Sequence, residues 1–430
     1  MRTVAREIFR YALTESSIEK AFSRHLSYER DVLRVCEDLY DITSHSRVLV
    51  ISLGKAGHRM AEALAGHMGA TAAGIIADPN PPSHQLSGYR YFAGSHPYPN
   101  AESVLGAEAI LKTLRRLGPG SLALFLISGG GSSVVETPID PEISLEGLIT
   151  TYRALVHSGA PIAQINTIRK HLSAVKGGRM AKAAAEAQQV SILVSDVPEN
   201  FLDALSSGPT MPDSTTVEDC YHIAGEYGML ENFPPAVREL FAHRALEETP
   251  KPDDAIFGRS RWWNILSNET AEKAAAVAAA QHGFAVEIDH SCDDWEYHKA
   301  ADYLLDRLRR LHQEVSKACI ISGGEVTVRV TGNAGLGGRN QQFVLDCATK
   351  IAGENIAVLS AGTDGIDGNS PAAGGGADGT TLERAGAAGL DVVDHLRRFD
   401  SFPLLEKLGD AIHTGPTGNN IRDIRILLAY

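Results

Sequence analysis

The sequence predicts an α/β protein of two domains, each built on a mostly parallel, doubly wound sheet. Three observations lead to this prediction. Short apolar runs of strand length alternate with helical stretches, which is the pattern of βαβ units. Several of these runs end in glycine-rich or acidic turns. The chain has 430 residues, more than one hydrophobic core usually serves, so two domains are expected.

In the first half, we expect strands where apolar residues run without interruption and helices where they recur every three or four positions. The expected strands are Val48–Leu53, Ala73–Ala77, Leu122–Ile127 and Val190–Val194. The expected helices are Ala56–Met68, Ala101–Arg116, Leu145–His157 and Pro161–Ala174. The polar, proline-containing stretch Pro234–Asp254 then interrupts the rhythm. We therefore place the two domains at residues 1–250 and 251–430.

The second half repeats the same alternation. Its expected strands are Trp263–Ser267, Ala285–Ile288, Ala318–Ile321, Ile356–Ser360 and Ile424–Leu428. Its expected helices are Glu269–His282, Trp295–Glu314 and Gln341–Ile351. Val326–Val330 alternates valine with polar residues, which predicts a half-exposed strand in a hairpin or at a sheet edge.

Composition narrows the classes of function. The net charge of −13 disfavours nonspecific binding to nucleic acid or to an anionic membrane. The five cysteines are scattered and form no Cys-x-x-Cys pair, which argues against a disulfide framework and a zinc site. The N-terminus lacks the apolar segment of a signal peptide, and no apolar run is long enough to span a bilayer. We expect a soluble, cytoplasmic protein.

The predicted strands end in residues suited to chemistry. In open α/β sheets, ligands bind at the carboxyl ends of the strands. Five such ends carry small, glycine-rich or acidic residues: Ser52–Lys55, Ser128–Ser133, Ser195–Asp196, Ser322–Glu325 and Gly362–Gly365. We expect them to converge on one site in a cleft between the domains.

The triple-glycine loop after the third expected strand is a candidate anion site. It comprises Ser128, Gly129, Gly130, Gly131, Ser132 and Ser133. Glycines let backbone amides approach an anion closely, and serines add hydroxyl donors. The alternative is a flexible turn. The chain has neither a Walker A loop nor a G-x-G-x-x-G dinucleotide fingerprint, so the binding mode is a different one.

Local positive charge accompanies these loops. Six Lys or Arg residues and no acidic residue lie between Gly147 and Ala185, and Lys176 and Arg179 flank a glycine pair there. A solvated basic helix face is the alternative interpretation. Lys55 lies at the start of an expected helix, where the helix dipole disfavours a cation unless an anion is bound.

A second glycine-rich segment, residues 332–340, lies between a strand and a helix. Its expected ligand-binding residues are Gly337, Gly338 and Asn340. Arg339 falls in the first helical turn, where a cation is mildly destabilising without an anion. The planar guanidinium suits the charge of a transferring phosphoryl group.

Carboxylates at the strand ends suit Mg²⁺, which binds one or two carboxylates together with phosphate oxygens and water. Asp364 and Asp367 lie on a glycine loop, although Asp-Gly also favours ordinary turns. Asp196 and Glu325 are further candidates, either as metal ligands or as acceptors of a hydroxyl proton.

Taken together, these motifs resemble the class II glycerate kinases, the glycerate 2-kinase family whose C-terminal half is called the MOFRL domain. The resemblance covers nearly the whole chain. Its matching segments, in chain order, are Gly54–Ala56, His96–Pro97, Ser128–Ser133, Asn166–Ser173, Lys176–Arg179, Ser195–Pro198, Ser207–Thr210, Ser322–Glu325, Gly337–Asn340, Gly362–Gly365 and Thr414–Thr417.

The resemblance implies two α/β domains, with residues 1–250 as the glycerate kinase domain and 251–430 as the MOFRL domain. It implies transfer of phosphate from ATP to D-glycerate, giving 2-phosphoglycerate, with Mg²⁺ as cofactor. It points to Lys55 and Arg339 as catalytic residues, and we add Asp196 from its position. The sequence leaves the oligomeric state open, with a homodimer among the alternatives.

Two segments depart from the family pattern. Glu199-Asn200 stands where the family usually has Gly-Asp, and Gly418–Ile421 reads Gly-Asn-Asn-Ile instead of Gly-Thr-Asn-Val. The first departure leaves room for a related hydroxy acid as substrate. Two further alternatives are an NAD(P)H-dependent hydroxypyruvate reductase, which the missing dinucleotide fingerprint opposes, and a ligand-binding protein without turnover.

Overall fold

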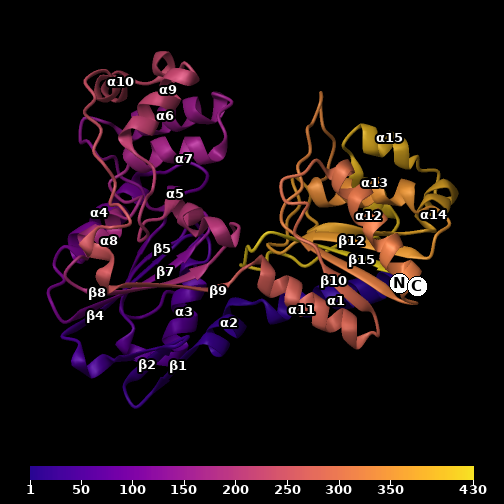
Figure 1. Cartoon of the computed structure of the whole chain (residues 1–430), viewed down its shortest axis with the longest axis horizontal. Helices are drawn as coiled ribbons and strands as arrows, with labels where there is room; N and C mark the ends of the chain where they lie inside the picture. The colour runs from indigo at the N-terminus through magenta and orange to yellow at the C-terminus, as the bar shows by residue number, and fades with distance from the viewer. The chain divides into compact units, whose positions relative to one another are not determined.

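The computed structural model describes all residues, Met1–Tyr430, and divides into two compact units (Figure 1). The contiguous unit comprises residues 22–265, and the split unit combines residues 1–21 with 266–430. The expected division at residues 250 and 251 differs from these units in two places. The segment before 266 supplies the edge strand of the first sheet, and the first helix packs with the C-terminal elements.

The large sheet of the contiguous unit is parallel across its first five strands, as the sequence predicts. The strand order is β6-β5-β4-β7-β8-β9, and the pairs from β6 to β8 are all parallel. The strands are β4 (Arg47–Leu53), β5 (Gly74–Ala77), β6 (Tyr89–Phe92), β7 (Ser121–Ser128), β8 (Gln188–Val194) and β9 (Ser260–Leu266). Every residue of β7 is buried, which is typical of a central parallel strand.

The order of these strands reverses between β4 and β7. The chain first moves outward from β4 to β5 and β6, and then returns to the other side of β4 as β7. Such a topological switch point is where open α/β sheets bind ligands, at the carboxyl ends of the strands.

Helices cover this sheet as the doubly wound pattern requires (Figure 1). α3 (Gly57–Met68) contacts β4, β5 and β7, while α4 (Ala101–Leu114) and α8 (Arg179–Ala183) share a core with the other face. A separate group of helices packs around its own core. Its members are α6 (Leu145–His157), α7 (Ile162–His171), α9 (Val217–Glu226) and α10 (Pro235–Ala242).

The remaining elements near this unit are short. They are α2 (Ile18–His25), β1 (Leu26–Glu29), β2 (Val32–Val35), β3 (Asp38–Asp41), α5 (Gly131–Val134) and the 3₁₀ helices Ile42–Ser44, Gly69–Thr71, Glu199–Ser207, Met229–Asn232 and Ala255–Arg259. β1, β2 and β3 form an antiparallel sheet that the sequence analysis did not predict.

The sheet of the split unit is mixed, whereas a mostly parallel sheet was expected. Its order is β10-β11-β15-β12-β13-β14, and only β10 and β11 pair in parallel. The strands are β10 (Ala285–Ile288), β11 (Ala318–Gly323), β12 (Ile356–Gly362), β13 (Gly374–Asp378), β14 (Ala411–Ile412) and β15 (Asp423–Ala429). The last strand inserts antiparallel between β11 and β12, and an apolar run does not reveal its direction in advance.

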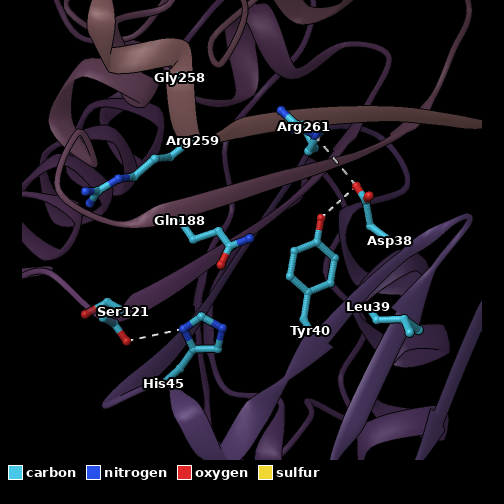
Figure 2. A pocket seen from close by; sticks show the side chains of 10 residues that line it. Asp38, Leu39, Tyr40, His45, Ser121, Gln188, Gly258, Arg259 and Arg261 are labelled. Carbon is cyan, nitrogen blue, oxygen red and sulfur yellow. Dashed lines mark hydrogen bonds and ion pairs between the residues drawn. The ribbon is translucent and has the colours of Figure 1, made fainter.

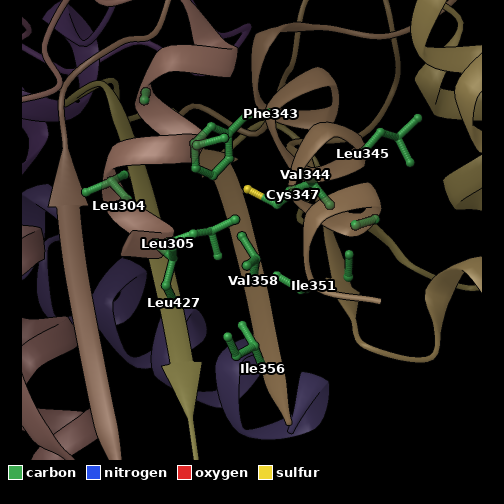
Figure 3. Packing of buried hydrophobic residues seen from close by; sticks show 14 of the residues in the cluster. Leu304, Leu305, Phe343, Val344, Leu345, Cys347, Ile351, Ile356, Val358 and Leu427 are labelled. Carbon is green, nitrogen blue, oxygen red and sulfur yellow. The ribbon is translucent and has the colours of Figure 1, made fainter. Parts of the chain in front are cut away.

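Two helical layers enclose this second sheet. α1 (Arg2–Glu15) and α11 (Asn268–Gln281) pack on each other and on the sheet. α12 (Tyr297–Glu314) and α13 (Arg339–Lys350) pack together and form a core with β11, β12 and β15, in which Leu305, Phe343 and Leu427 lie (Figure 3). The remaining helices are α14 (Thr381–Ala387), α15 (Val392–Arg397) and α16 (Ser401–Lys407).

The strand expected at Val326–Val330 does not form. Only Thr327 pairs, in an isolated bridge with Glu296, and Val330 is 48% exposed. A strand needs backbone pairing along its length, and this segment forms such pairing at Thr327 only. No helix of the structure combines the length and apolar character that crossing a membrane requires.

Candidate active site

The carboxyl edge of the parallel sheet brings together several residues that the sequence singled out. β4 leads into Gly54 and Lys55, β7 into the triple-glycine loop, and β8 into Ser195 and Asp196. Because these neighbouring strands are parallel, their ends lie at the same edge. The structure therefore gathers these residues at the switch point between β4 and β7.

Close backbone contacts hold the two loops at this edge. The Lys55 amide donates to the Gly129 carbonyl at 2.9 Å, and the Ala56 amide donates to Ser128 Oγ at 3.0 Å. A Cβ on Gly129 would stand 1.8 Å from Asp196 Oδ2. Glycine is needed at this position because the aspartate side chain occupies the space of a Cβ.

Lys55 and His96 border the same loop. A Cβ on Gly130 would stand 2.9 Å from Lys55 Cγ and 3.3 Å from His96 Cδ2. Partial desolvation of the ring and the charge of Lys55 lower the pKa of His96. Both effects favour the neutral imidazole. The Lys55 side chain is exposed and forms no ion pair, so its charge is open to an anion.

A cavity of about 480 Å³ opens beside the loop. Gly130, Ser132, Ser133 and Asp196 line it, as does His96. It is also lined by residues outside the predicted set: Tyr152, Asn166, Arg169, Ser206 and Ser207. The volume suits a small polar molecule.

Two serines complete the wall in a strained conformation. Ser206 and Ser207 have φ of 50° and 61°, in the left-handed region that non-glycine residues rarely occupy. Ser206 Oγ donates to the Ser128 carbonyl at 2.7 Å, and Ser207 Oγ lies 3.0 Å from Ser132 Oγ. The strain places two hydroxyls against the glycine loop. The dipeptide Ser-Ser before Gly-Pro was the only available signal in the sequence.

Lys176, expected to bind the cofactor, lies behind the cavity wall. Its ammonium is fully buried and pairs with Glu136, which also accepts hydrogen bonds from Tyr152 and Ser173. Burial lowers the pKa of Lys176, and the attraction of Glu136 opposes this effect. The Lys176 ammonium is therefore not available to a ligand in the cavity. Its role in the structure is to neutralise Glu136 behind the cavity wall.

The split unit contains a second charged cluster. β10, β11 and β12 run in the same direction, and β15 begins at the edge where β11 and β12 end. Glu325, Arg339 and Asp423 meet there. Arg339 donates to both Asp423 oxygens, at 2.6 and 3.0 Å, and its Nη2 lies 2.9 Å from Glu325 Oε1.

Arg339 remains charged in this cluster but is not fully engaged. Burial acts to lower the pKa of its guanidinium, and the bonds to Asp423 outweigh that effect and raise it. The side chain is 37% exposed, and Nη1 forms no hydrogen bond. Asp423 was not singled out in the sequence, because nothing in the apolar run that follows it indicates its position.

The glycine segment before α13 packs against protein. A Cβ on Gly338 would stand 2.3 Å from Asp367 Oδ1, and one on Gly368 would stand 2.3 Å from the Gly337 carbonyl oxygen. Asn340 is buried and bonds to Asp367 and Ser360. The geometry explains Gly337, Gly338 and Asn340 by close loop packing and does not support their expected role in cofactor binding.

The four expected metal ligands do not form one set. Asp367 is buried and accepts hydrogen bonds from the Asn340 and Gln341 amides, so it caps α13 instead of facing a metal. Asp364 accepts from the Ile366 amide at 3.0 Å and is half-buried. No group of three or more His, Cys, Asp or Glu side chains in the chain is arranged to hold a metal ion.

A second cavity, of about 440 Å³, lies at the opposite edge of the parallel sheet (Figure 2). Ser121 and Gln188, the first residues of β7 and β8, line it together with His45 and Arg261. None of the residues predicted for the site lies there, and amino-terminal strand edges are not where this sheet type binds substrates.

Comparison with known proteins finds two matching family models and several related sequences. A family described as a domain of unknown function (DUF4147) matches residues 4–242, and the MOFRL family matches residues 318–423. D-glycerate 2-kinase of Thermotoga maritima is 35% identical over 389 residues, covering 88% of this chain and 90% of that protein. A protein of Agrobacterium vitis, provisionally named a hydroxypyruvate reductase, is 35% identical over 389 residues, covering 89% and 87%.

A solved structure extends the likeness to the whole fold. The crystal structure of a glycerate kinase from T. maritima matches with a TM-score of 0.87 and 32% sequence identity. The match covers 100% of this chain and 99% of the other. The chain therefore belongs to the class II glycerate kinase family, the glycerate 2-kinase family that carries the MOFRL domain.

Proposed function

We propose that this chain transfers the γ-phosphate of ATP to the C2 hydroxyl of D-glycerate, giving 2-phosphoglycerate and ADP. The observation that carries the proposal is the meeting of Lys55, the triple-glycine loop and Asp196 at the switch point of the sheet. Membership of a family with a D-glycerate 2-kinase supports the same substrate and product.

In the proposed reaction the glycerate hydroxyl oxygen attacks the γ-phosphorus in line. The new bond joins this oxygen to phosphorus, the bond from phosphorus to the ADP oxygen breaks, and the hydroxyl proton passes to the Asp196 carboxylate. Lys55 binds the phosphate oxygens and stabilises the charge of the transition state. Ser132 and Ser207 supply hydroxyls that orient the substrate.

Arg339 is the second proposed catalytic residue. Its Nη1 is open while Asp423 and Glu325 hold the rest of the guanidinium in place, so the group has a donor left for a phosphoryl oxygen. Loss of one such charge clamp typically costs about two or more powers of ten in rate. Near-normal turnover of Arg339→Ala would show that this assignment is wrong.

The donor chemistry at the carboxyl edge fits Mg²⁺ bound together with the nucleotide. Mg²⁺ takes one or two protein carboxylates and completes its shell with phosphate oxygens and water. Asp196 and Asp364 are the two candidate ligands, and Asp364 is the one that leaves the Asp196 carboxylate available for the hydroxyl proton. When bound, the ion would neutralise phosphate charge.

The test is to incubate the protein with ATP, Mg²⁺ and D-glycerate, follow ADP release, and couple the product to enolase. Immediate coupling supports 2-phosphorylation, and coupling only after a mutase is added indicates the 3-isomer. No ADP release at millimolar glycerate rejects the substrate. Consumption of NADH with hydroxypyruvate would support the reductase alternative instead.

A further inference from the structure

Arg169 is a cation of the cavity wall that no protein group neutralises. It lies in the last turn of α7, and Ile162 and Asn166 on the same helical face also line the cavity. Its side chain forms no ion pair and no hydrogen bond, and its Nε is buried without a partner. Unpaired buried donors of this kind are costly unless a ligand satisfies them.

The neighbouring lysine shows what an ordinary structural cation does here. Lys170 follows Arg169 in the same turn, and its ammonium pairs with Asp203 at 3.0 Å and Asp213 at 3.2 Å. The chain has a net charge of −13, yet none of its carboxylates forms an ion pair with Arg169.

The guanidinium is held in a fixed orientation. Its central carbon lies 4.7 Å from the centre of the Tyr152 ring, and Tyr152 is itself buried and donates to Glu136. Stacking on an aromatic face sets the plane of the guanidinium and lowers the entropy lost when it binds.

The buried carboxylate nearby does not cancel this charge. Glu136 is already engaged by Lys176, Tyr152 and Ser173. Glu136 and Lys176 balance each other, which leaves the charge of Arg169 directed at the cavity. Repulsion from Arg169 contributes to lowering the pKa of Lys176, which agrees with an uncompensated positive charge at this wall.

We propose that Arg169 binds the carboxylate of the substrate, so that the site selects 2-hydroxy carboxylates over neutral polyols. The inference rests on the proposed function and names the group that sets its substrate class. A planar guanidinium donates two parallel hydrogen bonds to a carboxylate, whereas Lys55, a point charge beside the glycine loop, suits phosphate. Arg169 thus binds the carboxylate of the hydroxy acid, and Lys55 binds the phosphate of the nucleotide.

The test compares three variants by steady-state kinetics. Arg169→Met removes the charge, Arg169→Lys keeps the charge without the fork, and Arg153→Met is the matched control. Arg153 also stacks on a tyrosine, Tyr98, at 5.1 Å but does not line the cavity.

For Arg169→Met we expect the KM for D-glycerate to rise roughly 10- to 100-fold, the size of a lost charged hydrogen bond pair. The KM for ATP should change less than about threefold, and Arg169→Lys should recover part of the loss. Discrimination between D-glycerate and glycerol should fall by the same factor as the KM rises. Arg153→Met should match the wild type.

Other results overturn the proposal. An unchanged KM for glycerate would mean that Arg169 does not bind the substrate. A rise in the KM for ATP alone would mean that Arg169 binds the nucleotide. If Arg169→Met does not fold by circular dichroism, the lysine variant decides, because wild-type kinetics with lysine exclude a bidentate role.

Failure of the proposed function can be distinguished from failure of this inference. If the wild type does not phosphorylate D-glycerate, calorimetric titration with D-glycerate and D-lactate, without nucleotide, still measures carboxylate binding. Binding that is lost in Arg169→Met and kept in Arg153→Met supports the inference. Equal binding by all variants, or no binding by the wild type, rejects it.

Discussion

Lys55, against the glycine loop, and Arg169, in the cavity wall, are two cations that form no ion pair with a carboxylate of the chain. Lys170 and Lys176, by contrast, lie in ion pairs with Asp203, Asp213 and Glu136. These two buried lysines are therefore neutralised by acidic side chains of the chain itself. Arg169 lines the cavity at the carboxyl edge, and Lys55 lies against Gly130 of the same loop, so an anionic substrate bound there would supply the missing charge.

Removal of the Lys55 ammonium should impair catalysis more than binding. In Lys55→Met we expect kcat to fall roughly 100-fold or more, because the charge acts on the transferring phosphoryl group. Lys112→Met is the control, since Lys112 is exposed on α4 away from the cavity. ADP release at saturating ATP and glycerate measures the effect. A kcat within threefold of the wild type would exclude Lys55 from the charge clamp.

The buried Glu136–Lys176 pair should be costly to break on one side. Glu136→Gln leaves a buried ammonium without its counter-ion, which should reduce the free energy of unfolding by about 3–5 kcal/mol. Glu218→Gln, in the exposed pair with Arg244 of the same unit, should cost about 0–1 kcal/mol. Urea denaturation at pH 7 compares them. Similar costs for both variants would mean that Lys176 is solvated.

At the scale of elements, the sequence predicts which residues end the parallel strands. It does not predict which other residues lie beside them in the folded protein. Lys55, the triple-glycine loop and Asp196 come together because parallel strands share a carboxyl edge, and apolar runs reveal parallel strands. Asp423 could not be predicted, since it depends on β15 entering antiparallel. The positions of Ser206 and Ser207 depend on left-handed backbone angles, and serine, unlike glycine, does not indicate such angles in a sequence.

The glycines before α13 show a different limit. Their spacing correctly indicates that another group packs closely against this backbone, but it does not identify that group. A ligand was expected, and the side chain of Asp367 occupies the place. An acidic side chain that accepts amide hydrogen bonds at a helix start is a cap, and the cap and the anion site share the same sequence signal.

This cap should make the start of α13 sensitive to pH. Burial raises the pKa of Asp367 to about 7, with the charge of Asp423 adding to the effect and the amide hydrogen bonds opposing it. The unfolded chain therefore loses this proton at lower pH than the folded one. Between about pH 4 and 7, rising pH should lower the free energy of unfolding, by up to about 4 kcal/mol from this group.

Asp367→Asn removes the titration, so urea denaturation of both proteins at pH 5 and 7.5 isolates it. The stability of the wild type relative to Asp367→Asn should fall as pH rises. Asp306→Asn, at an exposed site on α12, should keep a constant difference from the wild type. A wild-type advantage that grows with pH would mean that the hydrogen bonds outweigh burial and keep the carboxylate charged.

At the scale of the whole molecule, the two units are not successive segments of the chain. The N-terminal helix α1 packs with α11, β12 and β15, although more than 240 residues separate it from them in sequence. Ile8 and Phe9 are almost fully buried in this packing. The split unit therefore cannot complete its core until both ends of the chain are present.

Truncation of Phe9 should weaken the split unit and spare the contiguous one. Phe9→Ala leaves a cavity beneath α1, and such changes cost about 3–5 kcal/mol. Limited proteolysis with mass spectrometry should show faster cleavage within residues 266–430, with residues 22–265 as resistant as in the wild type. Arg10→Ala, next along the same helix and exposed, should leave both patterns unchanged. If residues 22–265 were cleaved first in Phe9→Ala, α1 would have to support the contiguous unit, and the division of the chain at residues 21 and 266 would be wrong.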